Sequence, residues 1–121
     1  MILDHPLVSR RVFFPRATDV EPSHYVDVGG ANVTCYLRQP FPDAGLVLHF
    51  HGNGELASEY ATHRTGMFVG QGVNVCFAEY RGYGLSSGVP APVTMLGDGE
   101  KLVEALGVPP EKLVVFVVLC V

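Results

Sequence analysis

The sequence of 121 residues contains no tryptophan and only three cysteines, none of them in a C-x-x-C arrangement. Such an odd and sparse set offers no disulfide framework and is typical of a reducing compartment. The apolar runs are far shorter than the roughly 20 residues that a membrane-spanning helix needs. The N-terminal residues also lack the apolar stretch of a signal peptide. We therefore expect a cytoplasmic protein without a membrane segment.

Charge is scarce as well, because only 17% of the residues are charged, and the net charge is −4. The basic residues form no cluster beyond the pair Arg10-Arg11, so we expect no nucleic-acid partner. The 48% of hydrophobic residues and the length indicate one globular domain. We predict a single, incomplete domain over residues 1–121. Residues 1–23 would be an N-terminal extension with an edge strand at 11–15, and residues 24–121 the sheet core.

The spacing of apolar residues predicts the order of the elements. Two alternating β patterns flank Gly29-Gly30-Ala31 and predict an antiparallel hairpin. Three near-continuous apolar strands follow, separated by two helical patterns. The hairpin strands cover residues 24–28 and 32–37, the apolar strands 46–51, 73–78 and 113–118, and the helices 55–69 and 93–106. We predict an α/β fold in which two crossover helices join three parallel strands in three layers.

Two glycine-rich motifs follow the first two parallel strands. The first strand runs into His51-Gly52-Asn53-Gly54, and the second into Glu79-Tyr80-Arg81-Gly82-Tyr83-Gly84. A strand, a turn with backbone N–H groups and then a helix make an anion-receptive corner in α/β enzymes. The sequence therefore predicts an anion site at the first motif.

Together the two motifs resemble those of the α/β-hydrolase superfamily, in the serine-hydrolase branch with an HGN turn and a D-Y-R-G-Y-G-x-S-x-G loop. The resemblance covers residues 25–116, the N-terminal half of that fold, and Glu79 stands where Asp is usual. It implies Ser-His-Asp hydrolysis of small ester, thioester or amide substrates, without a cofactor. It also implies an oxyanion hole at Asn53 and Gly54, supported by His51 and Gly52. The family loop would comprise Arg81, Gly82, Tyr83 and Gly84, with Arg81 in a structural role.

The resemblance further implies a G-x-S-x-G elbow after the third parallel strand. The sequence there reads Val117-Val118-Leu119-Cys120-Val121, which places Leu119 at the position of the serine. We therefore expect no catalytic residue in this chain. One hypothesis is a truncated or frame-altered gene product of a hydrolase. The alternative is a non-catalytic α/β interaction module that self-associates through its exposed C-terminal strand.

Several other patterns have competing interpretations. The segment Gly84-Leu85-Ser86-Ser87-Gly88 matches G-x-S-x-G, but prolines follow it and no helix starts there, so we interpret it as a surface loop. His49 and His51 would share one face of a strand, so a metal site is one interpretation of the pair. The simpler interpretation is that His49 packs inside the protein and His51 orients the turn.

Three further features have simpler explanations than a site. Gly82-Tyr83-Gly84 lacks the third glycine and the helix of a dinucleotide loop. Cys120 is one position away from the expected nucleophile, and we expect it to be buried or frayed rather than reactive. The last helix carries Asp98, Glu100, Lys101 and Glu104, which we interpret as a solvated face.

Overall fold

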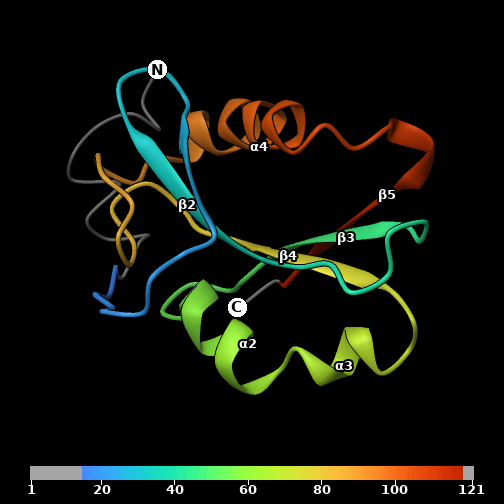
Figure 1. Cartoon of the computed structure of the whole chain (residues 1–121). Coiled ribbons are helices and arrows are strands. Elements are labelled where there is room, and N and C mark those ends of the chain that lie inside the picture. Colours follow the sequence, from blue (N-terminus) through green and yellow to red (C-terminus); the bar gives the residue numbers. More distant parts are fainter. Residues whose placement is uncertain (1–14, 119–121) are drawn as a thin grey trace.

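The computed structural model describes residues 15–118, which form a five-stranded mixed sheet with helices on both faces (Figure 1). The strands are β1 (His24–Asp27), β2 (Asn32–Arg38), β3 (Leu46–Phe50), β4 (Asn74–Ala78) and β5 (Leu113–Val117). The helices are α2 (Ala57–His63), α3 (Gly66–Val69) and α4 (Pro92–Leu106), and a 3-10 turn (Pro110–Lys112) precedes β5. Most of the edge strand predicted at 11–15 lies outside the described residues, as do Leu119, Cys120 and Val121.

The strand order is β1-β2-β4-β3-β5. The hairpin of β1 and β2 is antiparallel and turns at Gly29 and Gly30, whose φ angles of +83° and +80° favour glycine. β2 joins the hairpin to β4 in antiparallel pairing, and β3 lies between β4 and β5, parallel to both. The predicted fold class, an antiparallel hairpin followed by three parallel strands, is therefore confirmed.

Two apolar cores form because each strand alternates its side chains between the two faces of the sheet. On the α4 face, Cys35, Leu48 and Cys76 pack with Leu102. On the face of α2 and α3, Tyr36 and Phe77 are among the residues that form the second core. β4 is buried along its whole length, as its continuous apolar sequence predicts.

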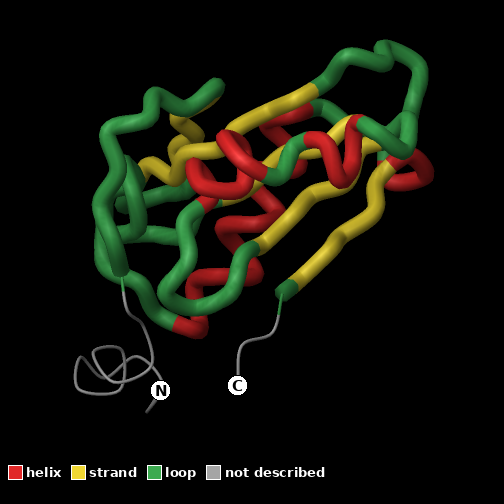
Figure 2. Tube along the Cα trace, turned by 90° about the horizontal axis from the view of Figure 1, so that it is seen from below, coloured by secondary structure: helices red, strands yellow, loops and turns green. Residues whose placement is uncertain are grey.

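β5 is the edge of the described sheet, and it is largely uncovered (Figure 2). The exposed fractions of Val114, Val115, Phe116 and Val117 are 61%, 54%, 47% and 53%. A groove of about 720 Å³ separates β5 from α4 and is lined by apolar side chains, including Leu96 and Val115. Of the three parallel strands, β5 is therefore the one whose side chains are largely exposed.

One helix prediction needs correction. The helix predicted over residues 55–69 is divided into α2 and α3, because the chain leaves helical geometry at Arg64, where φ is −125° and ψ is 5°. Just after the break, the Thr65 hydroxyl donates to the Ala61 carbonyl, a side-chain bond that competes with the helix. In α4 only Leu102 is buried, whereas Leu96 is 77% exposed.

None of the helices within residues 15–118 is long and apolar enough to cross a membrane.

Candidate functional site

The carboxyl ends of the three parallel strands meet at one end of the sheet. The HGNG turn (residues 51–54) follows β3, and a long connection, loop 79–91, follows β4. The chain leaving β5 lies beside the turn, since the Val118 N–H donates to the Phe50 carbonyl at 2.9 Å. Ligands of α/β sheets bind at this end because the connecting loops converge there.

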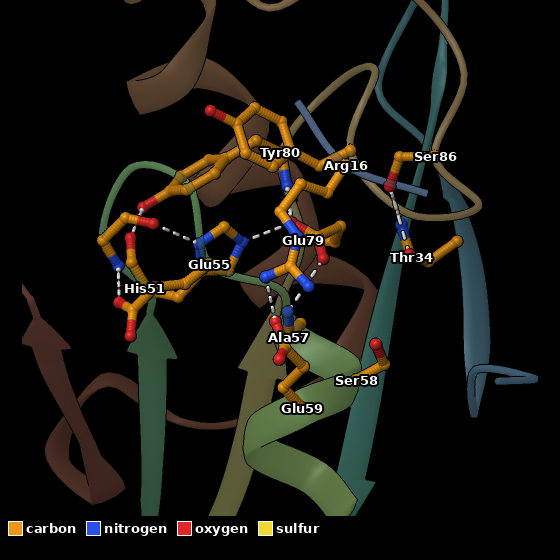
Figure 3. A network of polar contacts seen from close by, with 12 residues as sticks. Arg16, Thr34, His51, Glu55, Ala57, Ser58, Glu59, Glu79, Tyr80 and Ser86 are labelled. Carbon is orange, nitrogen blue, oxygen red and sulfur yellow. Dashed lines mark hydrogen bonds and ion pairs between the residues drawn. The ribbon is translucent and has the colours of Figure 1, made fainter. Parts of the chain in front are cut away.

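His51 is buried at the base of the HGNG turn, and both of its ring nitrogens face acceptors (Figure 3). Nδ1 donates to the Gly52 carbonyl at 2.8 Å, and Nε2 pairs with the Glu79 carboxylate. The Tyr80 hydroxyl donates to the His51 carbonyl at 2.7 Å. The ring and the backbone of His51 are thus both fixed, and His51 orients the turn.

Glu79 links three segments through its two carboxylate oxygens (Figure 3). Oε1 accepts from His51 and from the Tyr80 N–H at 3.0 Å, whereas Oε2 accepts from the Ala57 N–H at 2.9 Å. The side chain is buried, so these bonds replace the water that a carboxylate otherwise needs. Glu79 therefore connects the end of β4 with the HGNG turn and with the first residue of α2.

The pKa values of His49 and His51 shift in opposite directions because the surroundings of the two rings differ. Burial disfavours the charged form of His51, but the hydrogen bond and charge of Glu79 outweigh it and raise the pKa of His51 above its ordinary value. Burial, followed by the charge of His51, lowers the pKa of His49 to about 4. Of the two histidines, His51 therefore keeps its proton to the higher pH.

The rest of the turn is anchored by side chains on either side. The Gly52 N–H donates to Glu55 Oε1 at 2.6 Å, and the Tyr60 hydroxyl donates to Glu55 Oε2 at 2.9 Å. The Tyr83 hydroxyl donates to Asn53 Oδ1 at 2.7 Å, which ties loop 79–91 to the turn. Gly54 has a φ of +81°, so the turn needs glycine there.

Arg16 reaches the same turn from outside. Its guanidinium donates to the Gly54 carbonyl at 3.1 Å and pairs with Glu59 of α2 at 2.5 Å (Figure 3). Its backbone carbonyl accepts from the Gly84 N–H at 2.7 Å. The segment before β1 therefore bridges both glycine-rich motifs.

Loop 79–91 packs against the hairpin and α4. Arg81 forms a bidentate pair with Asp98 at 2.7 and 2.9 Å and also donates to the Gly29 carbonyl at 3.2 Å. Gly82 has a φ of +75°, and a Cβ there would lie 2.7 Å from Pro90 Cδ. The interpretation of Asp98 as part of a solvated face is therefore wrong, because its carboxylate is largely buried against Arg81.

The serines of the G-x-S-x-G match bond to β2. Ser86 is buried, and its Oγ accepts from the Thr34 N–H at 2.9 Å and lies 3.1 Å from the Thr34 hydroxyl. Ser87 Oγ accepts from the Asn32 N–H at 2.8 Å, and its own N–H donates to the Asn32 carbonyl. In Figure 3, Ser86 points towards Thr34 and away from the imidazole of His51. This geometry fits a structural loop.

His49 packs in an aromatic cluster on the face of α2 and α3. Its ring stacks on Phe116 of β5 with centroids 5.3 Å apart, and it also contacts Tyr60, Phe68 and Phe77. Within residues 15–118, no group of three His, Cys, Asp or Glu side chains is placed to hold a metal ion.

Sequence reasoning missed three side chains that support the turn: Arg16, Glu55 and Tyr60. It named Glu79, Tyr80 and Tyr83 as members of the second motif, but not their bonds to the turn. The available signal was position, because Glu79 to Tyr83 follow the strand that pairs with β3. A polar side chain at the end of a buried strand must find a partner.

No protein-family model matches the sequence, and no curated protein matches it either. Among solved structures, the chain is similar to the crystal structure of an alpha-beta hydrolase from Vibrio vulnificus, with a TM-score of 0.56 and 22% identity. The match covers 79% of this chain and 32% of the hydrolase chain. The described sheet therefore has a partial α/β-hydrolase fold, and this chain spans about a third of that hydrolase.

Proposed function

We propose that this chain is the N-terminal part of an α/β-hydrolase-type acyl hydrolase and that its HGNG turn supplies half of an oxyanion hole. The observation that carries the proposal is the fixed turn at the carboxyl end of β3. His51 and Glu55 bond to the carbonyl and the N–H of Gly52, and Tyr83 bonds to the side chain of Asn53. The partial hydrolase fold supports the same reaction class.

The chemistry follows from the backbone donors. Attack on an ester, thioester or amide carbonyl makes a negative oxygen, and one preorganised N–H donor contributes about 3–4 kcal/mol to its stabilisation. In our proposal the Asn53 N–H is that donor, with Gly54 beside it. Glycines on both sides of Asn53 allow a substrate to approach the backbone closely.

In this proposal the nucleophile is not part of these 121 residues, because the five residues from Val117 onward, where the elbow is expected, contain no serine. We therefore expect no hydrolysis of p-nitrophenyl acetate or butyrate by this chain above the rate of a denatured sample. The genomic DNA beyond the Phe116 codon, translated in all frames, tests the origin of the chain. A G-x-S-x-G followed by an Asp and a His would support a hydrolase gene.

Anion binding at the turn can be measured by NMR on the ¹⁵N-labelled protein. We expect butyrate to shift the amide signals of Asn53 and Gly54 more than any others, and chloride at equal ionic strength to leave them in place. Asn53→Pro removes the N–H and should abolish binding. Asn53→Ala keeps the N–H, so it should retain binding. Butyrate shifts spread evenly over the protein would contradict the proposal.

A second candidate function is self-association through β5. The observation that favours it is the exposure of Val114 to Val117 on an edge strand that carries no charge. Unpaired edges of this kind pair readily with another strand. In this proposal the chain serves as an interaction module, whether or not it takes part in hydrolysis.

A further inference from the structure

We propose that the buried pair of His51 and Glu79 polarises the Gly52–Asn53 peptide group and thereby strengthens the Asn53 N–H as an anion donor. This inference rests on the proposed function of the HGNG turn. It assigns a positioning and electrostatic role to two residues that touch no substrate.

The pair reaches the donor through one hydrogen bond and one peptide group. His51 Nδ1 donates to the carbonyl oxygen of Gly52 at 2.8 Å, and that carbonyl and the Asn53 N–H belong to one peptide group. Amide resonance couples the two ends, so a donor at the oxygen makes the N–H more positive. The Glu55 N–H donates to the same oxygen at 3.2 Å and acts in the same direction.

The geometry also separates the two ends of this peptide. In a trans peptide the carbonyl and the N–H point in opposite directions, and no described peptide bond is cis. Gly52 and the His51 ring are buried, whereas Asn53 is exposed. The polarising imidazole therefore lies inside the protein, while its effect reaches the exposed residue Asn53.

The proton on Nδ1 depends on Glu79. Both partners of the imidazole, the Gly52 carbonyl and the Glu79 carboxylate, are acceptors, so only the doubly protonated ring satisfies both. When the ring loses a proton, the stronger charge-assisted bond to Glu79 retains Nε2–H. The bond from Nδ1 to Gly52 is then the one that is lost, and the polarisation of the peptide with it.

The titration of His51 can be distinguished from that of the groups around it. The charged or titratable side chains that face the ring are His49 from β3, Glu55 directly after the turn, and Glu79, Tyr80 and Tyr83 from loop 79–91. His49 is neutral at neutral pH, because its pKa is lowered to about 4. Burial raises the pKa of Tyr80, so this hydroxyl also stays protonated. A titration near neutral pH can therefore be assigned to His51 from its ring signals.

The test is an NMR titration of the ¹⁵N-labelled chain between about pH 5 and pH 9, the range in which histidines change charge. The His51 ring nitrogens report the proton, and the Asn53 amide reports the polarised peptide. We expect both to change with the same midpoint, the amide proton moving upfield as His51 loses charge. We expect the affinity for butyrate to fall with that midpoint too.

Glu79→Gln should move both midpoints to lower pH together, because the carboxylate that holds the proton is gone. Glu104→Gln is the matched control, an exposed carboxylate on α4, and should move neither. If Glu79→Gln does not fold, the titration of the unaltered chain still shows whether the Asn53 amide follows the His51 ring.

The outcomes separate the two proposals. An Asn53 amide that stays constant while His51 titrates would overturn the polarisation, even if butyrate binds. An Asn53 amide that follows His51 in a protein that does not bind butyrate would uphold the polarisation and overturn the anion-site function of the turn.

Discussion

Arg81 and Asp98 form a bidentate pair in which the guanidinium of loop 79–91 meets the carboxylate of α4 at 2.7 and 2.9 Å. Side-chain exposures of 17% and 13% place this pair away from bulk water. Burial and fork geometry together distinguish it from an ordinary surface ion pair. The pair holds loop 79–91 in place between the hairpin and α4.

We expect Arg81→Lys to destabilise the fold by about 1–2 kcal/mol, because an ammonium cannot make both bonds of the fork. Urea unfolding of Arg81→Lys, Asp98→Asn and the double variant gives the coupling energy. Glu104→Gln on the same helix should change stability by less than about 0.5 kcal/mol. A coupling energy indistinguishable from zero would show that the pair contributes nothing to stability.

Glu79→Asp introduces the residue that is usual at this position in the α/β-hydrolase motif, but we expect it to destabilise this protein. A side chain one methylene shorter cannot keep Oε1 on His51 and Oε2 on the Ala57 N–H at once. The loss of a buried charge-assisted bond should cost about 1–3 kcal/mol, and Glu79→Gln, which breaks the ion pair, should cost about 3 kcal/mol or more. Unchanged urea midpoints for Glu79→Asp would refute this role of the longer side chain.

Ser86→Ala should destabilise the protein by about 1–3 kcal/mol, because it leaves the buried Thr34 N–H without its acceptor. Ser87→Ala is the matched control in an exposed position, and we expect a loss below about 1 kcal/mol. Thermal unfolding of both variants provides the comparison. Hydrolysis of p-nitrophenyl acetate that disappears in Ser86→Ala at unchanged stability would instead identify Ser86 as a nucleophile.

Stability should pass through a maximum near pH 6.5. Between about pH 6.5 and pH 4 the unfolded chain binds a proton at His49 that the folded chain excludes, so stability falls as the pH decreases. His51 has a raised pKa, so its contribution is complete below about pH 6.5 and is lost as the pH rises through the folded value.

Urea unfolding at a series of pH values measures both limbs of this profile. His49→Phe should flatten the acid limb above about pH 5, where carboxylates titrate little. His63→Gln, at an exposed position, should leave the profile unchanged. An acid limb that persists in His49→Phe would show that another group causes it.

The exposed strand β5 predicts self-association that depends on concentration. Val115→Lys places a charge on the uncovered edge and should shift the protein towards the monomer, as charges do on natural edge strands. Thr62→Lys, at an exposed position on α2, controls for net charge. Light scattering over a range of concentrations measures the mass of each variant. If the unaltered chain is a monomer at every concentration, the proposed self-association is contradicted.

The fold was predictable wherever the apolar pattern of a segment matches its burial in the structure. Continuous apolar sequence identified β3 and β4, and Gly29-Gly30 identified the hairpin, because glycine suits the positive φ of that turn. The break between α2 and α3 was not predictable from apolar spacing, which continues through it. The exposed C-terminal strand was expected from the resembled fold and not from the apolar pattern of β5, which is like that of β3 and β4.

The candidate site was predictable in its backbone and in the turn-orienting side chain of His51. The glycines located the HGNG turn, but its support comes from side chains distant in sequence. Glu79 contacts His51, 28 residues away, and Ala57, 22 residues away. Asp98 likewise looked like a solvated residue because its partner Arg81 lies 17 residues earlier, beyond any helical spacing.

The bonds between loop 79–91 and the hairpin also constrain how the protein is made. Ser86 and Ser87 satisfy N–H groups of β2 that lie 52 and 55 residues earlier in the chain. During synthesis the hairpin therefore leaves the ribosome long before the residues that complete its hydrogen bonds. At a translation rate of about 5–20 residues per second, the N–H groups of β2 lack these acceptors for several seconds. The nascent hairpin must rely on water, or on a chaperone, until its partner loop has been translated.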